Sequence, residues 1–479
     1  MLVGGIVMTD YRKERDSLGE VEVPFDALYG ANSLRAKNNF NITSTSMDKE
    51  MINAIVEVKK ACAIENEKIG LLTKIQKDAI VAACNQILAG QHRDNFIVDS
   101  IQGGAGTSFN MNANEVIANV ANTAMGGGLG SYEYVHPNDH VNLGQSTNDV
   151  IPTSGKIALI RYYNELIDET ILLIRSIEKK AEEFKDVYKM GRTQLQDAIP
   201  ISLGQEFRAY ARVITRDLER FDLAVDSLSH VNLGGTAIGT GLNADPTYVE
   251  EIVGVLSEVT DLKLKQNEDL IDGTQNLDGF LYVSGVLKTF AANLSKISND
   301  LRLMSSGPQV GIGDIKLKAT QAGSSIMPGK VNPVIPEVVN QVAFNVIGND
   351  MTVTMAVEAG QLELNAFEPI IFYNLFESLK TLKNAIYTLR INCIDHITAD
   401  RSELSEQVEK SIGLVTALAP HIGYAKASDI AHKALETGKS IRELVLSDEL
   451  LSKEELEKIL DFKEMIKPGI LDEDALKKE

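Results

Sequence analysis

The chain has 479 residues, a length that predicts more than one domain. Hydrophobic residues make up 44% of the chain and charged residues 24%, a balance typical of folded globular proteins and not of disordered ones. The formal net charge of -20 opposes binding to nucleic acid phosphates and to anionic lipid headgroups, so we expect no nucleic acid and no membrane as partners. Any positive charge that binds an anionic substrate must therefore be local to its site.

The first residues, MLVGGIVMTDYRK, contain an apolar run that is too short for a signal peptide or a membrane span. Translation from Met8 would leave the first seven residues as an upstream extension. The three cysteines, Cys62, Cys84 and Cys393, lie far apart in apolar, helix-like stretches and form no CxxC pair. We expect buried thiols in a reducing compartment, which predicts a cytoplasmic protein.

Strand signals are few, with Val21–Val23 as the clearest, and helical patterns dominate the chain. Apolar residues recur with a 3-4 spacing in four segments, less regularly in residues 160–177, and this spacing places them on one face of a helix. Residues 338–355 look like a fifth helix. In chain order, the five segments are residues 160–177 (entered by Pro152-Thr153-Ser154), 210–228, 283–304, 338–355 (started by Pro336-Glu337) and 375–393.

The pattern predicts an all-α fold in which long helices pack nearly parallel in a bundle. We divide the chain into three domains: a mixed helical domain of residues 1–148, a central domain of long helices over 149–399, and a small helical domain over 400–479. Several helices exceed the roughly 10–14 residues typical of globular domains. A long helix can carry a second apolar stripe into a neighbouring subunit, so oligomerisation is expected.

Four polar, glycine-containing stretches interrupt this pattern. Their hydroxyls, amides and glycines form helices poorly, but they supply hydrogen-bond donors suited to an anionic ligand. One such cluster is usually a loop or a helix cap, whereas four in one helical chain indicate a ligand site. The stretches are QGGAGTSFNMNANE (102–115), HPNDHVNLGQSTND (136–149), KMGRTQLQDAIP (189–200) and QAGSSIMPGKVNPVIPE (321–337).

GSSIMPGKVNP (323–333) resembles the signature of the aspartase/fumarase superfamily. GTSFNMNANEV, HPNDHVN, QSTND, GRTQLQDA, SLGQEFRAY and SSGPQVGIGDI also look like blocks of that family, in family order, so the resemblance covers nearly the whole chain. VNPVIPEVVNQV and GNDMTVTMAVEAGQLELN are similar to the aspartate ammonia-lyases within it.

The resemblance implies the reversible deamination of L-aspartate to fumarate and ammonia by a serine-base β-elimination through an aci-carboxylate. It also implies a homotetramer with a multi-helix core and with sites shared between three subunits. It implies no cofactor and no metal ligand, although activation by a divalent cation, seen in some relatives, stays open.

The resemblance assigns the catalytic base to Ser324. Substrate-binding roles fall on further residues that match the family blocks. Among them, Thr107, Ser146, Thr147 and Ser325 match contacts to the β-carboxylate, Thr193, Lys330 and Asn332 match contacts to the α-carboxylate, Asn148 matches a contact to the amino group, and Ser108 and Gln194 complete the expected set.

Other interpretations remain for several of these residues. Thr107 and Thr147 alternatively cap helices, Lys330 is alternatively a solvated loop residue, and Asn332 alternatively orients the turn before Pro333. Each of these roles is common for its residue type in a loop or at a helix end.

Gln194 stands where many relatives have histidine after GRT, and glutamine does not transfer protons near neutral pH. This favours an aspartase over a class II fumarase, which is the nearest alternative. His136 and His140 resemble a second, non-catalytic anion site of fumarases, and a ligand role there stays open. A catalytically silent structural protein and a dicarboxylate-binding module are further alternatives, neither of which needs Ser324.

Overall fold

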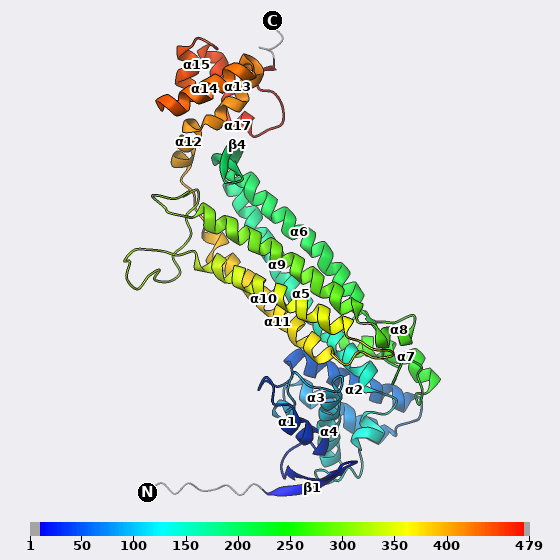
Figure 1. Cartoon of the computed structure of the whole chain (residues 1–479). Helices are drawn as coiled ribbons and strands as arrows, with labels where there is room; N and C mark the ends of the chain where they lie inside the picture. The colour runs from blue at the N-terminus through cyan, green and yellow to red at the C-terminus, as the bar shows by residue number, and fades with distance from the viewer. Residues whose placement is uncertain (1–9, 474–479) are drawn as a thin grey trace, which may run out of the picture. The chain divides into compact units, whose positions relative to one another are not determined.

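The computed structural model describes residues 10–473 of the chain (Figure 1), so the apolar run before Met8 lies outside the described residues. Helices dominate, and the described strands form three two-stranded sheets. The predicted all-α fold class is therefore confirmed. Within residues 10–473, no helix combines the length and the apolar character needed to span a bilayer.

Contacts between residues divide the chain into two compact units. Unit 1 comprises Met1–Ile167, Glu219–Ala291 and Phe344–Leu382, and unit 2 comprises Asp168–Leu218, Ala292–Ala343 and Lys383–Glu479. The boundaries of the three predicted domains stay a prediction.

Five long helices have residues in both units. They are α5 (Thr147–Glu183), α6 (Leu203–Leu228), α9 (Asp278–Met304), α10 (Val334–Glu358) and α11 (Glu368–Asn392). These are the five helices that the sequence predicts. Every residue of the predicted stripe on α9, from Val283 to Met304, is buried, as is every residue of the stripe on α11, from Leu375 to Cys393.

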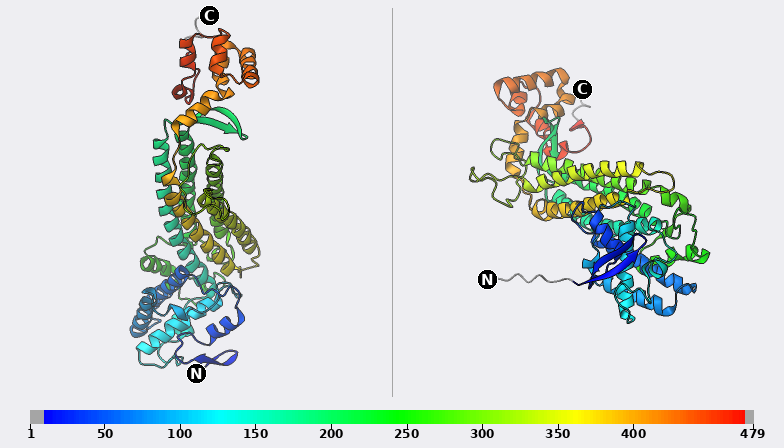
Figure 2. Two further views of the ribbon diagram at one scale, coloured as in Figure 1. Left: turned by 90° about the vertical axis from the view of Figure 1, so that its left-hand side faces the viewer. Right: turned by 60° about the horizontal axis from the view of Figure 1, so that its bottom comes forward.

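Unit 1 also contains an antiparallel hairpin, six shorter helices and a short parallel strand pair. The predicted strand Val21–Val23 lies within the hairpin. Helices α2, α3 and α4 lie side by side (Figures 1 and 2). The elements are β1 (Tyr11–Asp16), β2 (Gly19–Pro24), α1 (Ala31–Asn39), α2 (Lys49–Lys68), α3 (Lys74–Leu88), α4 (Thr107–Ala124), β5 (His230–Val231), α7 (Pro246–Thr260), β6 (Lys265–Gln266) and α8 (Leu270–Gln275).

Unit 2 contains a second antiparallel hairpin and the helices of the C-terminal segment, which pack around an apolar core that includes Met190 of the hairpin. The predicted C-terminal helices are present. The elements are β3 (Tyr188–Thr193), β4 (Gln196–Ser202), α12 (Arg401–Lys410), α13 (Val415–Ile422), α14 (Tyr424–Thr437), α15 (Ile441–Ser447), α16 (Lys453–Ile459) and α17 (Phe462–Met465).

The stretches 102–115 and 136–149 interrupt the helical pattern, as expected, but each also continues into a helix. Thr107 begins α4 and Thr147 begins α5, so each stretch supplies the first turn of a helix. A third stretch, residues 189–200, forms most of the β3–β4 hairpin. Polar residues continue into α4 because several of these amides are buried and bonded inside the fold, as Asn110, Asn112 and Asn114 are.

The predicted entry of α5 at Pro152 is also wrong, because Pro152 lies inside the helix. Proline has no N–H to donate to the carbonyl four residues earlier, which here belongs to Asn148. The side-chain Nδ2 of Asn232 donates to that carbonyl instead, at 3.1 Å, and Asn232 is fully buried. The helix therefore continues through the proline with its free acceptor satisfied.

This substitution of one donor for another predicts a rescue. Asn232→Ala should lower the free energy of unfolding by about 1–3 kcal/mol, because it leaves the partly buried Asn148 carbonyl without its donor. Adding Pro152→Ala should recover part of the loss, because alanine restores the N–H. Urea unfolding of the two single variants, the double variant and the wild type at equal protein concentration measures this. A double variant that is no more stable than Asn232→Ala would show that the Asn148 carbonyl does not carry the effect.

Candidate active site

The predicted site residues fall into two groups, one in each unit. Unit 1 holds five of them, near the first turns of α4 and α5. They are Thr107, Ser108, Ser146, Thr147 and Asn148. Unit 2 holds the other six, in the β3–β4 turn and in the stretch before α10. They are Thr193, Gln194, Ser324, Ser325, Lys330 and Asn332.

The first turn of α4 follows a backbone that only glycine accommodates without strain. Gly104 and Gly106 have φ values of +87° and +89°. A side chain at Gly106 would also contact Ile151, one turn into α5, because a Cβ there would lie 3.0 Å from that side chain. The close approach packs the start of α4 against α5 and leaves the Thr107 side chain exposed.

A chain of hydrogen bonds connects the starts of the two helices. The buried Asn110 on α4 donates from Nδ2 to Thr147 Oγ1 at 3.3 Å and to Asn142 Oδ1 at 3.2 Å. Ser146 Oγ accepts from the N–H of Asn148 at 3.2 Å. These bonds place Ser146, Thr147 and Asn148 next to the start of α4.

Lys59 of α2 stabilises the segment that leads into α5, a role that the sequence analysis missed. This fully buried lysine donates from Nζ to Asn142 Oδ1 at 2.9 Å and to Gln145 Oε1 at 2.8 Å. Burial lowers the pKa of Lys59 to about 7, while the buried carboxylate of Asp149 opposes this shift. In the sequence, only a lysine among apolar helical residues hinted at this role.

Asp149 was missed as well, although it belongs to the QSTND block. Its fully buried carboxylate accepts from the N–H groups of Ser146 (2.9 Å), Gly234 (3.1 Å) and Thr236 (3.0 Å). Burial raises the pKa of Asp149 to about 6, and these N–H donors and the charge of Lys59 oppose the rise. The carboxylate thus ties the start of α5 to the segment after β5.

In unit 2, Thr193 and Gln196 pair at the end of the β3–β4 hairpin, and Gln194 and Leu195 form its two-residue turn. Both turn residues have positive φ values, +53° and +63°, where glycine or asparagine is usual. Next to the turn, Arg192 Nη1 lies 2.6 Å from an oxygen of the buried Asp314. Thr193 and Gln194 are exposed. The ion pair between Arg192 and the buried Asp314 holds the hairpin next to them in place.

Ser324 is a half-buried residue of a closed loop. Its hydroxyl accepts from two backbone N–H groups, those of Ile326 at 3.2 Å and Met327 at 3.0 Å. Asn332 Nδ2 donates to the carbonyl of Gly323 at 2.5 Å. Any side chain at Gly323 would overlap the Lys330 carbonyl oxygen, since a Cβ would lie 1.6 Å from it. Gly323 and Asn332 therefore close the loop that carries Ser324, Ser325 and Lys330.

The two histidines of HPNDHVN bond within their own turn, and His140 Nε2 also lies 3.1 Å from Gln76 Nε2 on α3. His136 Nδ1 accepts from the N–H groups of Asn138 and Asp139, each at 3.2 Å, and His140 Nδ1 accepts from the N–H of His136 at 2.8 Å. Burial lowers the pKa of His140. These contacts account for both residues as parts of a turn, and a ligand role stays a prediction.

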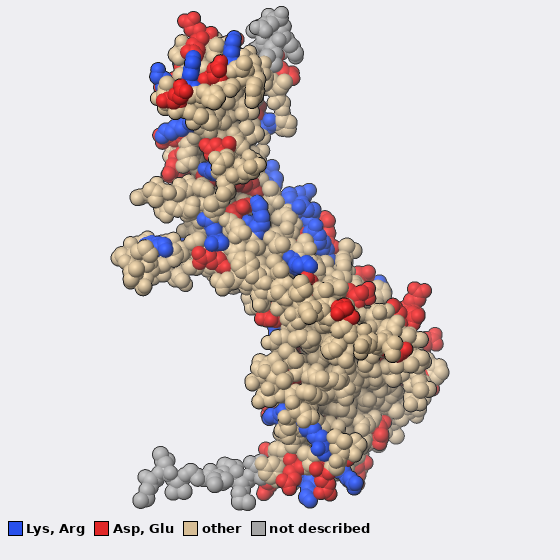
Figure 3. Space-filling model, in the orientation of Figure 1, with Lys and Arg blue, Asp and Glu red and all other residues tan. Residues whose placement is uncertain are grey.

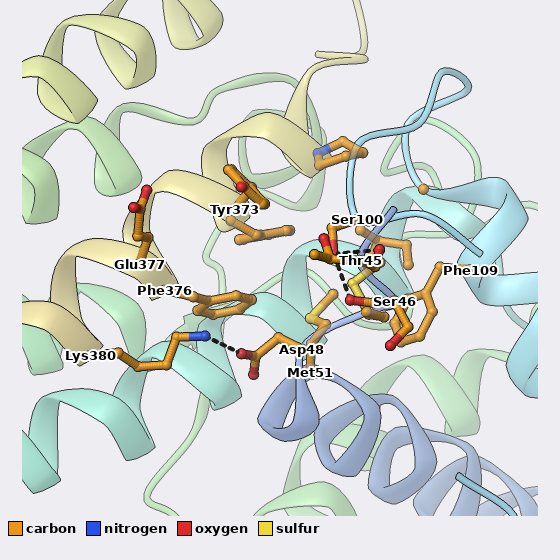
Figure 4. Close-up of a pocket in the computed structure, with 15 residues that line it drawn as sticks. Thr45, Ser46, Asp48, Met51, Ser100, Phe109, Tyr373, Phe376, Glu377 and Lys380 are labelled. Carbon is orange, nitrogen blue, oxygen red and sulfur yellow. Dashed lines mark hydrogen bonds and ion pairs between the residues drawn. The ribbon is translucent and has the colours of Figure 1, made fainter. Parts of the chain in front are cut away.

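A separate cavity of about 240 Å³ in unit 1 borders Gly106 and Phe109 (Figure 4). Aromatic side chains, including Tyr373 and Phe376, form much of its wall. At its edge, Lys380 Nζ and Asp48 Oδ2 lie 2.8 Å apart. None of the predicted site residues lines this cavity.

The predicted buried thiols are confirmed, because Cys62, Cys84 and Cys393 are all buried and unpaired. Burial raises the pKa of each thiol to about 12, so none is a nucleophile at neutral pH. Among residues 10–473, no cluster of three or more His, Cys, Asp or Glu side chains is arranged to hold a metal ion.

Comparison with sequence families gives two matches. A family model described as "Lyase" matches residues 19–348, and one described as "Fumarase C C-terminus" matches residues 414–467. Together with the helical fold, these matches define the class of protein, a lyase.

Curated relatives match over nearly full length. An aspartate ammonia-lyase from a Bacillus species is 51% identical over 96% of this chain and 99% of its own length. The aspartate ammonia-lyase of Escherichia coli (strain K12) is 48% identical over 96% of both chains. The chain therefore belongs to the lyase family of the aspartate ammonia-lyases.

Solved structures agree with this assignment. A protein described as fumarate lyase:delta crystallin from Brucella melitensis, bound to cobalt, superposes with a TM-score of 0.93 at 48% identity, over 96% of this chain and all (100%) of that one. The class II fumarase of Schistosoma mansoni superposes with a TM-score of 0.92 at 35% identity, over 95% of this chain and 99% of that one.

The buried lysine predicts a specific dependence of stability on pH. The unfolded chain keeps the Lys59 proton up to about pH 10, whereas the folded chain releases it near pH 7. Between these pH values the unfolded state binds more protons, so Lys59 makes the free energy of unfolding increase with pH, by at most about 1.4 kcal/mol per pH unit.

Lys59→Met should remove this increase, and Lys60→Met, at the half-buried neighbouring lysine, serves as the matched control. Urea unfolding at several pH values from about 6.5 to 9.5 measures the slope. If Lys59→Met and the wild type show equal slopes, the pKa of Lys59 is not lowered in the folded chain.

Proposed function

We propose that this chain converts L-aspartate to fumarate and ammonia by β-elimination. The reaction is supported by enzymes named aspartate ammonia-lyase, which are 51% and 48% identical to this chain over nearly its full length. The mechanism is argued from the Ser324 loop, where two backbone N–H groups donate to the serine hydroxyl. We further propose that the residues of the enzyme perform this chemistry without a cofactor.

The reaction places two demands on the protein. A base must take the C3 proton, which is only weakly acidic because its neighbour is already a carboxylate. Donors must then stabilise the second negative charge that develops on that carboxylate, and this is usually the largest electrostatic contribution to catalysis.

Ser324 is proposed as the base. A serine hydroxyl is a poor base unless its alkoxide is stabilised, and the two N–H groups that donate to Ser324 Oγ supply such stabilisation. The ammonium of Lys330, which belongs to the same closed loop, adds positive charge locally in a protein of net charge -20. On the face drawn in Figure 3, acidic and basic side chains are interspersed.

The remaining residues are proposed to hold the substrate. The β-carboxylate is assigned to Thr107, Ser146, Thr147 and Ser325, and the α-carboxylate to Thr193, Lys330 and Asn332. The amino group is assigned to Asn148. Ser108 and Gln194 also bind the substrate. Hydroxyl and amide donors on short segments bind two carboxylates without burying several charges.

We also propose a homotetramer whose sites combine residues of three subunits. Within unit 1, α10 exposes four large apolar side chains at helical spacing, Phe344 (62% exposed), Ile347 (41%), Met351 (63%) and Met355 (64%). A stripe of this kind favours burial against another chain. The buried thiols support a reducing compartment, and we propose a cytoplasmic location.

The activity and the base are tested together by following the ultraviolet absorbance of fumarate. The wild type should form fumarate from L-aspartate and not from L-malate. Ser324→Ala should lower kcat by about 100- to 10,000-fold, the usual contribution of a positioned base. Ser447→Ala, which removes a hydroxyl bonded within α15, is the matched control and should keep full activity. Fumarate formed mainly from L-malate would identify a fumarase instead.

The assembly is tested on the exposed stripe of α10. Met351→Glu combined with Met355→Glu should give species smaller than a tetramer in light scattering after gel filtration, because charge at an apolar contact opposes association. Activity should fall in parallel if sites need several subunits. Leu18→Glu introduces the same charge at a residue that is 79% exposed in the β1–β2 turn, and it should leave a tetramer. A tetramer for the α10 variant would place the interface elsewhere.

A further inference from the structure

The amide of Asn148 has a defined orientation. Its Nδ2 lies 2.6 Å from the carbonyl oxygen of Ala237. A carbonyl only accepts hydrogen bonds, so the NH2 end of the amide must face Ala237. The Oδ1 end therefore points away from Ala237 and is left as an acceptor at the start of α5, next to Ser146 and Thr147.

The turn that presents the Ala237 carbonyl is strained. Thr236 has a φ of +55°, a conformation that β-branched residues rarely adopt. Two hydrogen bonds hold it, since its N–H donates to Asp149 Oδ2 at 3.0 Å and its Oγ1 donates to the Leu242 carbonyl at 3.1 Å. Strained backbone persists only where the surroundings enforce it, and it is common where a group must be aimed.

Asp149 bonds residues close in sequence to both partners of the Asn148–Ala237 contact. It follows Asn148 directly in α5 and accepts from the Ser146 N–H through Oδ1, while its Oδ2 accepts from Gly234 and Thr236. Its side chain is fully buried, so it does not contact a ligand. The carboxylate therefore sets the position of the Ala237 turn relative to Asn148.

The backbone of Asn148 is held from the same side. Its carbonyl accepts from Asn232 Nδ2 at 3.1 Å, which Pro152 permits by donating nothing there. Asn232 Nδ2 also donates to Thr274 Oγ1 at 3.0 Å, so it is anchored in turn. Both the backbone and the side-chain amide of Asn148 are thus fixed by the segment after β5.

We propose that Asp149 is a positioning residue: through the strained turn at Thr236 and Ala237, it holds the Asn148 amide so that Oδ1 accepts a hydrogen bond from the substrate ammonium. An ammonium carries only donors, so an amide oxygen fits it and an amide NH2 does not. This inference rests on the proposed function, in which Asn148 contacts the amino group.

The test measures ligand binding by calorimetry in the Ser324→Ala background, where turnover is suppressed. Asp149→Asn should weaken L-aspartate binding by about tenfold or more. In a chain that also carries Asn148→Ala, Asp149→Asn should weaken binding by less than about threefold further, because it acts through Asn148. Asp350→Asn neutralises another buried aspartate of unit 1, bonded to Ser284 and Lys288, and should leave the Kd for L-aspartate unchanged.

A second variant covers the case in which Asp149→Asn does not fold. Thr236→Gly relieves the strained backbone and loosens the turn, leaving the bond between Asp149 and Ser146 in place. It should weaken L-aspartate binding by about fivefold, while the Kd for succinate, which has both carboxylates and no amine, stays within about twofold.

Three results would overturn this inference. The losses of L-aspartate affinity caused by Asp149→Asn and Asn148→Ala multiply in the double variant, or Thr236→Gly weakens the binding of L-aspartate and of succinate equally. In the third, the Ser324→Ala protein does not bind L-aspartate at all. Failure of the proposed function is seen separately, as a wild-type enzyme that binds L-aspartate and forms no fumarate.

Discussion

The carboxylate of Asp149, fully buried and bonded to three backbone N–H groups, is the interaction on which the unit 1 half of the candidate site depends. Burying a charge is costly unless its hydrogen bonds are satisfied, so the surrounding backbone must stay in place for the folded state to tolerate it. Lys59 adds a nearby charge of opposite sign and bonds the segment before α5. The start of α5 is therefore defined by buried polar contacts and only secondarily by helix propensity.

Unit 2 achieves comparable order by different means. A backbone clash that only glycine avoids shapes the Ser324 loop at Gly323, and Asn332 closes the loop by donating to the Gly323 carbonyl. Asp314, also buried, bonds Arg192 next to the turn that carries Thr193 and Gln194. Hydroxyls and amides of unit 2 thus lie on segments held by specific contacts, of which the one to Asp314 is buried. Such order limits the conformational entropy that is lost when a ligand binds.

A structural feature can be predicted from the sequence when the interaction behind it leaves a repeat in neighbouring residues. The apolar stripes of α9 and α11 were predictable because burial of one helix face imposes a repeat on the chain. The start of α5 was not predictable, because the donor that satisfies the carbonyl left free by Pro152 belongs to Asn232, eighty residues further along the chain. The β3–β4 hairpin was missed for a related reason, since its turn residues Gln194 and Leu195 have positive φ values without the usual glycine.

The candidate site shows the same division. The polar stretches marked its segments, and the family resemblance assigned roles to Ser324, Lys330 and Asn148. Lys59 and Asp149, which bond the segment around Asn148, left too weak a signal to be assigned a role. A buried charge is recognised only when its partners, distant in sequence, are known.

The central claim is that the enzyme removes a proton from C3 of aspartate and breaks the C–N bond at C2, and that it reverses both steps when it adds ammonia to fumarate. The most direct test runs the reaction in reverse, from fumarate and ammonia in D2O, and examines the aspartate by mass spectrometry and NMR. The account predicts L-aspartate with one deuterium at C3, on a single face. Ser324→Ala should form this product at least about 100-fold more slowly. Malate as the product, or aspartate labelled on both faces of C3, would contradict it.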